Sequence, residues 1–289
     1  MGSLKIGLGL PNSTRSLTHG RLLIDIARQA EQLGFSSLGT IGRIAYPNYE
    51  ELITLAAAAA VTDRIGLMTD VLLSATREPV LLAKQAATLD QISGGRFVLG
   101  VGVGIRRDDF TVTGYHYGDR GRRMDAALEL MQRAWRGETL PGGDHPIGPR
   151  PVNGDSVPMM FGGQADAVVR RVAHYGIGYT LGGGQPDALK GIMARIDAAW
   201  KAAGRTGRAE YRALSYFAIG DDVASEAEQN ILGYYGDYGS RVWAGAIKTP
   251  EQARERVKLF EDIGCDELLI FMAAPSTEQA ERLAKAVIA

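Results

Sequence analysis

Cysteine is almost absent from this chain of 289 residues, and neither sign of charge is in excess. A single thiol, Cys265, cannot form an intrachain disulfide or a CxxC metal site, so we expect a reducing, cytoplasmic compartment. The 32 Lys and Arg residues nearly balance the 33 Asp and Glu residues, and the net charge is −1. This balance offers no electrostatic basis for binding nucleic acid or an anionic membrane.

Long apolar runs are lacking as well. The longest, residues 55–61, consists mostly of alanine and is far too short to cross a bilayer. The segment from Lys5 to Pro11 does not have the pattern of a signal peptide, so we expect none. With 45% hydrophobic and 22% charged residues, the composition is typical of a soluble globular protein.

The motifs of several common enzyme classes are missing. No Walker A, HExxH or GxSxG sequence occurs, which argues against P-loop NTPases, HExxH zinc hydrolases and α/β-hydrolases. The four histidines are scattered without metal-ligand spacing, so we predict no metal site. None of the seven lysines stands convincingly at the end of a predicted strand, which disfavours a barrel aldolase.

Short β-rich runs alternate with helical stretches along the whole chain. Most are dominated by Val, Ile, Leu, Met and Phe, as expected for parallel strands covered on both faces. Eight strands, each followed by a helix, favour a (β/α)₈ TIM barrel formed as one domain by residues 1–289. An open, doubly wound α/β sheet is the alternative. The predicted strands are Lys5–Leu10, Ser37–Ile41, Ile65–Leu73, Phe97–Val103, Pro158–Phe161, Gly178–Leu181, Arg212–Ile219 and Glu267–Met272.

Capping signals mark several of the helices between these strands. Capping-box sequences begin at Asn48, Thr249 and Ser276, and each predicts the start of a helix. Pro79 follows Glu78 at a first helical turn, where the missing N–H of proline costs nothing. These signals support the alternation of strands and helices.

Two stretches interrupt that alternation. Residues 137–157 are rich in Gly and Pro and predict an ordered excursion before the fifth strand. Residues 223–248 lie between the seventh and eighth strands, on the face where barrel loops gather. They predict either a lid over that face or a helical pair packed on the barrel or on a second subunit. Their aromatic residues are Tyr234, Tyr235, Tyr238 and Trp243.

Glycines alternate on the fourth predicted strand. Gly100, Gly102 and Gly104 face the same side of this strand and lack the G-x-G-x-x-G spacing of a dinucleotide site. A strand face without side chains lets a flat ligand approach the backbone or lets a helix pack closely. The spacing alone favours close packing.

Glycine-rich turns follow the next two predicted strands and lead into helices. Backbone N–H groups at such turns form anion sites, and in a barrel the two loops are neighbours on the C-terminal rim. The turns therefore indicate a phosphate-bearing ligand, although Asp166 would repel a phosphate and tight-turn geometry is the alternative. The residues are Gly162, Gly163 and Gln164 in one turn and Gly182, Gly183 and Gly184 in the other.

Residues 88–104, Thr-Leu-Asp-Gln-Ile-Ser-Gly-Gly-Arg-Phe-Val-Leu-Gly-Val-Gly-Val-Gly, resemble the bacterial-luciferase-like superfamily of flavin and deazaflavin enzymes. The segments 77–87 and 120–130 fit the same pattern, as do the N-terminal strand and the Gly162–Gly163 turn. The resemblance covers essentially the whole chain, and residues 77–130 are its most specific part. It is consistent with the TIM barrel that the alternation predicts.

The resemblance implies a flavin-type ring near the C-terminal mouth of the barrel. In the family a bulge, often with a non-proline cis peptide, ends the third strand and supports the ring; the matching residues here are Asp70, Val71 and Leu72. The phosphate tail lies toward the loops after the fifth and sixth strands, which match the two glycine turns. Gly102 and Gly104 would then clear space beside the ring.

Two positions depart from deazaflavin-dependent dehydrogenases of the superfamily. The sugar-phosphate and alcohol dehydrogenases usually carry Asp-His after the second strand, where this chain has Thr40-Ile41-Gly42-Arg43. The sugar-phosphate enzymes also place a Glu where this chain has Ile105. Oxidising an alcohol by hydride transfer needs a base for the hydroxyl proton, so both departures disfavour that reaction.

The resemblance and the departures together favour a flavin-dependent oxidoreductase of the luciferase-like monooxygenase type, using reduced FMN and O₂ on a small organic substrate. The alternatives are an F420-dependent reductase resembling methylene-tetrahydromethanopterin reductases and a catalytically weak flavin-binding protein. NAD(P)H or a separate flavin reductase would supply electrons, and the family implies a homodimer. The substrate-side candidates are Arg43, Tyr46, Arg106 and His116.

Overall fold

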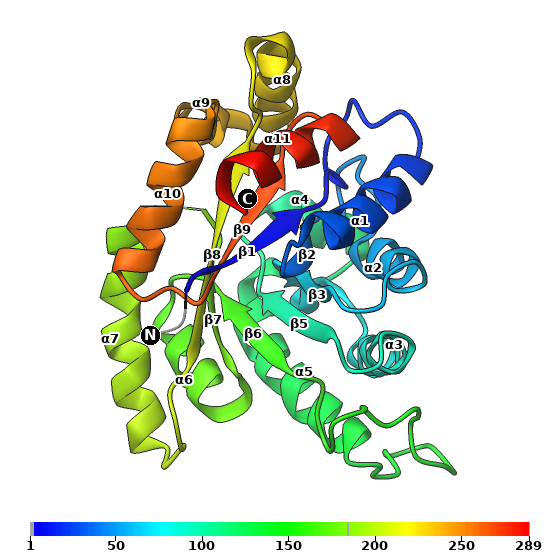
Figure 1. Ribbon diagram of the computed structural model, residues 1–289. Helices are drawn as coiled ribbons and strands as arrows, with labels where there is room; N and C mark the ends of the chain where they lie inside the picture. The colour runs from blue at the N-terminus through cyan, green and yellow to red at the C-terminus, as the bar shows by residue number, and fades with distance from the viewer. Residues whose placement is uncertain (1–2, 184, 289) are drawn as a thin grey trace.

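The computed structural model describes residues 3–183 and 185–288, which form a closed barrel of eight parallel strands (Figure 1). The barrel closes because β3 pairs with both β2 and β5. The predicted TIM barrel is therefore confirmed. The strands are β1 (Lys5–Gly9), β2 (Ser37–Thr40), β3 (Gly66–Thr69), β4 (Leu72–Leu73), β5 (Phe97–Gly102), β6 (Met159–Gly162), β7 (Gly178–Leu181), β8 (Glu210–Phe217) and β9 (Glu267–Met272).

The third barrel strand is divided into β3 and β4. The sequence predicts one strand over Ile65–Leu73, but the peptide bond between Asp70 and Val71 is cis and interrupts it. β3 pairs with the start of β5 and β4 pairs with its end, so both parts keep their place in the sheet. The interruption lies where the family resemblance implies a bulge.

Helices surround the barrel, and each barrel strand is followed by at least one (Figure 1). Over the described ranges, none of them is both long enough and apolar enough to cross a membrane. They are α1 (Arg21–Leu33), α2 (Glu51–Ala59), α3 (Pro79–Ile92), α4 (Arg107–Thr113), α5 (Arg120–Trp135), α6 (Asp166–Tyr175), α7 (Pro186–Ala202), α8 (Ala224–Tyr235), α9 (Gly239–Ala244), α10 (Pro250–Asp262) and α11 (Thr277–Val287).

Capping side chains begin four of these helices, and one of them is Glu78, whose carboxylate accepts hydrogen bonds from the backbone N–H groups of Val80 and Leu81 at the start of α3. Thr249 and Ser276 cap α10 and α11 as predicted, since each side chain accepts a hydrogen bond from the backbone N–H three residues on. The prediction that Asn48 caps a helix is wrong. Glu50 caps α2 instead, and its carboxylate accepts a hydrogen bond from the backbone N–H of Ile53 at 2.7 Å.

The two interruptions of the alternation differ in structure. Residues 137–157, between α5 and β6, contain no helix or strand and include a cis peptide before Pro149. Residues 223–248 contain α8 and α9, and Figure 1 shows α8 rising above the strands. Apolar residues of α8, including Ile231 and Tyr234, share one buried cluster with residues of β8 and β9. The helical pair therefore packs on the barrel.

Candidate active site

A cavity of about 170 Å³ opens at the C-terminal end of the barrel strands, the end at which TIM-barrel enzymes place their active sites. The loop after β2, the interruption between β3 and β4, the loop after β5 and the C-terminal end of α8 supply most of its walls. The lining residues are Ile41, Gly42, Arg43, Asp70, Val71, Leu73, Ile105, Arg106, Asp109, Gly182, Leu214, Tyr234 and Tyr235.

Asp70 is a buried carboxyl group that lines this cavity at the interruption of the third strand. Its Oδ1 accepts a hydrogen bond from Thr180 Oγ1 at 2.7 Å, whereas Oδ2 has no partner among the described residues. Burial raises the pKa of Asp70 to about 6, against the lowering effects of Thr180 and the Arg212 guanidinium. Because a buried acceptor without a donor is costly, Oδ2 suits a ligand that presents an N–H or O–H group.

The glycines of β5 make room for the interrupted strand. A Cβ on Gly100 would lie 1.8 Å from the carbonyl oxygen of Thr69, and one on Gly102 would lie 2.9 Å from Cγ2 of Val71. Val71 also fills the space beside Gly162, where a Cβ would lie 3.2 Å from its Cγ1. The close packing at Gly100 and Gly102 is therefore between strands, where the sequence suggested a helix.

The remaining predicted cofactor glycines lie in turns. Gly104, Gly163 and Gly183 have φ values of +81°, +127° and +74°, a left-handed conformation that favours glycine. Gly182 lines the cavity, and a Cβ there would meet nothing within 4 Å. Gly184 lies outside the described residues. The turn after β7 thus borders the cavity directly.

The turn after β6 leads into α6 through an exposed polar residue, Gln164. Asp166, in the first turn of α6, forms an ion pair with Arg195 of α7. This pairing reduces the repulsion that Asp166 would exert on a phosphate near the helix N-terminus.

Arg43 is held at the cavity by two acidic residues of α4. Its guanidinium pairs with Asp108, and its Nε lies 3.6 Å from Oδ2 of Asp109. Asp109 is buried, and its Oδ1 accepts hydrogen bonds from the backbone N–H groups of Ile44 and Ala45 at 2.9 and 2.8 Å. The charge of Arg43 is therefore largely neutralised by α4, and the loop after β2 is tied to it.

Arg106 lies against aromatic side chains of α8. Its guanidinium carbon is 5.0 Å from the ring centre of Tyr234 and 5.7 Å from that of Tyr235. Tyr46 packs edge-on against Tyr234 with 5.1 Å between ring centres, and the hydroxyls of Tyr235 and Tyr216 are 2.7 Å apart. These contacts connect α8 to the loops after β2 and β5 at the edge of the cavity.

His116, the fourth predicted substrate-side residue, is not brought to this cavity. It lies between α4 and a 3₁₀ turn at Tyr117–Asp119, and its side chain is 82% exposed. The parts of the chain that the structure describes also contain no cluster of His, Cys, Asp and Glu arranged to hold a metal ion. Of the predicted substrate-side residues, the structure brings Arg43 and Arg106 to the cavity, whereas Tyr46 contacts the lining residue Tyr234 without lining the cavity itself.

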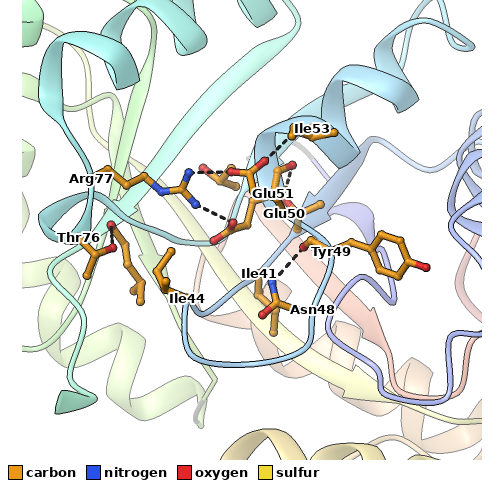
Figure 2. A network of polar contacts seen from close by, with 12 residues as sticks. Ile41, Ile44, Asn48, Tyr49, Glu50, Glu51, Ile53, Thr76 and Arg77 are labelled. Atoms are coloured by element: carbon orange, nitrogen blue, oxygen red, sulfur yellow. Dashed lines mark hydrogen bonds and ion pairs between the residues drawn. The ribbon is translucent and has the colours of Figure 1, made fainter. Parts of the chain in front are cut away.

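A charged network lies behind the loop after β2 (Figure 2). Arg77 donates from Nη1 to Glu50 Oε1 at 2.7 Å and from Nη2 to Glu51 Oε2 at 2.9 Å. Glu51 is buried, and its other oxygen, Oε1, has no partner within the described ranges. Burial raises the pKa of Glu51, and the Arg77 charge opposes the rise. The network joins the start of α2 to the segment that follows β4.

Gly42→Ala is expected to lower the free energy of unfolding by about 1–3 kcal/mol, the usual cost of overpacking. A Cβ at Gly42 would lie 2.4 Å from both Cδ and Oε1 of Glu51, which Arg77 holds in place. Urea denaturation measures the loss. Gly191→Ala is the control, because a Cβ on this glycine of α7 would meet nothing within 4 Å and alanine favours a helix. Equal stability of the two variants would contradict the prediction.

Sequence reasoning missed three carboxyl or hydroxyl groups of this region, Asp109, Thr180 and Glu51. For Asp109 one signal existed, since two acidic residues directly follow the arginines after the glycine-rich strand. Thr180 gives no local signal, because only the closed barrel brings it to Asp70, 110 residues away in the chain. Glu51 looked like part of a capping box, a role that does not require burial.

Comparison with known proteins agrees with the fold described above. The profile of the luciferase-like monooxygenase family matches residues 7–286. An uncharacterized protein of Mycobacterium tuberculosis is 31% identical over 227 residues, which cover 69% of this chain and 78% of that protein. The sequence similarity therefore extends over most of the barrel.

Solved structures with the same fold include a monooxygenase and cofactor complexes of two kinds. RslO1, a monooxygenase from Streptomyces bottropensis, superposes with a TM-score of 0.80 at 22% identity. An F420-dependent secondary alcohol dehydrogenase with an F420–acetone adduct gives 0.80 at 19%, and the oxygenating constituent of 3,6-diketocamphane monooxygenase from Pseudomonas putida, in complex with FMN, gives 0.77 at 18%. Each comparison covers 99% of this chain and at least 98% of the other. By the profile match over nearly its whole length, the chain belongs to the luciferase-like monooxygenase family.

Proposed function

We propose that this protein is a flavin-dependent monooxygenase that uses reduced FMN and O₂ on a small organic substrate. Membership of the luciferase-like monooxygenase family supports the reaction class. The observation that supports a flavin-type ring is Asp70, which lines the barrel-mouth cavity and whose buried Oδ2 has no hydrogen-bond donor among the described residues.

The residues around Asp70 fit a flavin. A flavin ring presents an N–H group, which can donate a hydrogen bond to Oδ2. Val71 is packed against Gly102 and Gly162 and forms an apolar surface at the same cavity. The glycine turns after β6 and β7 stand at the N-termini of α6 and α7, positions that suit the phosphate. Gly163 and the Gly182–Gly183 turn would hold it.

When bound, reduced FMN supplies the electrons that activate O₂. The chain itself binds the ring, orients it and excludes water from it. Asp70 holds an acceptor oxygen at the cavity, and Arg43 is kept in place by Asp108 and Asp109. Tyr234 and Tyr235 reach the cavity from α8, so the C-terminal end of this helix covers one side of the cavity.

An F420-dependent reductase is the second candidate. The observation that favours it is again Asp70, because a carboxyl whose pKa is about 6 is partly protonated near pH 6 and can deliver a proton to a substrate that is being reduced. The fold is compatible with this reading, as the TM-score of 0.80 to an F420-dependent enzyme indicates.

The test is a titration of the purified, cofactor-free protein with FMN and with F420, read by the fluorescence of each cofactor. We expect FMN to bind more tightly and the FMN-loaded protein to consume O₂ once the flavin is reduced. Tighter binding of F420 than of FMN would support the second candidate, a reductase that transfers hydride from F420, over the monooxygenase. Binding of neither cofactor would overturn both candidates.

A further inference from the structure

The barrel-mouth cavity contains one arginine that no acidic group neutralises within the described part of the chain. Arg43 is paired with Asp108 and Asp109. Arg106 forms no ion pair there, and its guanidinium group lies against the rings of Tyr234 and Tyr235. A half-buried cation without a counter-ion, at the wall of a cavity, is a site for an anionic group of a ligand.

The aromatic contacts of Arg106 leave its hydrogen-bond donors available. The two tyrosine rings lie 5.0 and 5.7 Å from the guanidinium carbon, within the range of cation–π contacts. Such contacts engage the charge of the guanidinium group, whereas its five N–H donors point outward in its plane. A carboxylate can therefore bind two of these donors side by side while Tyr234 and Tyr235 hold the group in place.

The rest of the cavity wall is largely apolar. Ile41, Val71, Leu73, Ile105 and Leu214 line it together with the two tyrosines. The charge of Asp109 is opposed by that of Arg43, whose Nε lies 3.6 Å from Asp109 Oδ2, and Asp109 Oδ1 accepts two backbone hydrogen bonds. Asp70 suits a donor such as a ring N–H. The lining thus combines an apolar surface with one oxyanion-binding group.

We propose that the substrate is a small aromatic or otherwise apolar organic acid whose carboxylate is bound by Arg106. The proposal rests on the proposed function, because it assigns a substrate class to the same cavity. The phosphate of the cofactor is the other anion that Arg106 could bind. The glycine turns after β6 and β7 already offer a place for that phosphate, which leaves Arg106 to the substrate.

The experiment compares benzoate with benzamide, its uncharged analogue of nearly equal shape, as ligands of the FMN-loaded protein. Binding is followed by the change in the absorption spectrum of the bound flavin. We expect benzoate to bind about tenfold to a hundredfold more tightly than benzamide, the contribution of a hydrogen-bonded ion pair. Arg106→Gln should bind the two compounds equally, and Arg106→Lys should keep part of the preference.

Arg107→Gln is the matched control. Arg107 is adjacent in sequence, but its guanidinium lies 4.5 Å from the ring centre of Tyr117 and it does not line the cavity. This variant should keep the full preference for benzoate. A native protein that does not prefer benzoate, or an Arg106→Gln variant that still does, would overturn the proposal.

Titration with FMN separates this proposal from the proposed function. Arg106→Gln should bind FMN as tightly as the native protein does. Loss of FMN binding in this variant alone would assign Arg106 to the cofactor phosphate, overturning the substrate proposal while the flavin function stands. Failure of the native protein to bind FMN would overturn the proposed function. The benzoate preference would then be measured on the cofactor-free protein by tyrosine fluorescence.

Discussion

Asp70→Asn is expected to weaken FMN binding about tenfold to a hundredfold at pH 8, the effect of losing a hydrogen bond to a charged group. Thr180 donates to Oδ1 in the native protein, so the amide nitrogen of the variant takes the place of Oδ2. The atom without a partner in the native protein thus changes from an acceptor to a donor, while the volume of the side chain hardly changes. Fluorescence titration of the cofactor-free protein measures the affinity.

The same carboxyl should make flavin binding depend on pH. Burial raises the pKa of Asp70 to about 6, so the carboxylate prevails at pH 8 and the acid at pH 5. Because the carboxylate is the better acceptor, affinity should fall about tenfold between pH 8 and pH 5. Riboflavin is the ligand for this series, since it has no phosphate that titrates. Asp70→Asn should show no such change, and a flat profile in the native protein would contradict the role of Asp70.

Asp70→Asn should also stabilise the cofactor-free protein at pH 8. The pKa of Asp70 in the folded protein, about 6, lies above the ordinary value of 3.8, so folding favours the protonated form. The ionised carboxyl therefore costs stability above pH 6, and this cost disappears as the pH falls toward 4. The difference between the two pKa values limits the increase in the free energy of unfolding to about 3 kcal/mol. Urea denaturation at pH 8 and at pH 4.5 measures it.

Asp90→Asn is the matched control for both effects. Asp90 is also buried, burial raises its pKa, and its Oδ1 has no partner among the described residues. It lies in α3 and accepts a hydrogen bond from the backbone N–H of Val152, away from the lining of the cavity. Its substitution should change stability without changing FMN affinity. Equal losses of FMN binding in both variants would indicate a general effect on the fold.

The barrel could be predicted from the sequence because its signals are local. Each strand is a short apolar run, and Thr249 and Ser276 cap their helices through residues three positions away. Asn48 shows the limit of local signals. Glu50 lies near the same helix start, and its side chain caps the helix by accepting a hydrogen bond from the backbone N–H of Ile53. A capping pattern alone does not reveal which of two nearby side chains reaches the backbone.

The candidate site was predictable where its residues follow strand ends. Arg43 and Arg106 line the cavity because the C-terminal ends of parallel strands meet at one rim. His116 also follows the glycine-rich strand, but α4 intervenes and leaves it exposed. Packing between distant segments decides the partners of the two arginines. It places Asp109 beside Arg43 and Tyr234 beside Arg106. Which arginine stays available to a ligand is therefore a property of the fold.

Arg77→Met is expected to lower the free energy of unfolding by about 3 kcal/mol, the usual cost of removing one partner of a buried ion pair. The side chain of Glu51 is 2% exposed, and Arg77 supplies its hydrogen bond at 2.9 Å (Figure 2). Methionine fills a similar volume but leaves this carboxylate buried without a cation. Urea denaturation measures the loss. Arg28→Met, which removes an exposed ion pair with Asp25, should cost less than about 0.5 kcal/mol.

The loss caused by Arg77→Met should be larger at pH 8 than at pH 5. Burial raises the pKa of Glu51 in the native protein, and removing the opposing charge of Arg77 raises it further. The folded variant therefore prefers the protonated acid, which forms more readily at the lower pH. Adding Glu51→Gln removes the titrating group, so the double variant should recover much of the stability at pH 8 and lose the pH dependence. A double variant no more stable than Arg77→Met would show that Arg77 acts through another contact.

The stability variants also connect this network to the proposed cofactor site. Glu51 lies directly against Gly42, and the loop that contains Gly42 lines the cavity. Arg77 holds Glu51 from the segment after β4, so one ion pair fixes two neighbouring walls of the barrel mouth. Arg77→Met should therefore weaken FMN binding even at a temperature where the variant is fully folded, and Arg28→Met should not. Unchanged FMN affinity in folded Arg77→Met would show that the network stabilises the fold without shaping the cofactor site. The cavity walls would then be held by the contacts of Asp109 and Arg43.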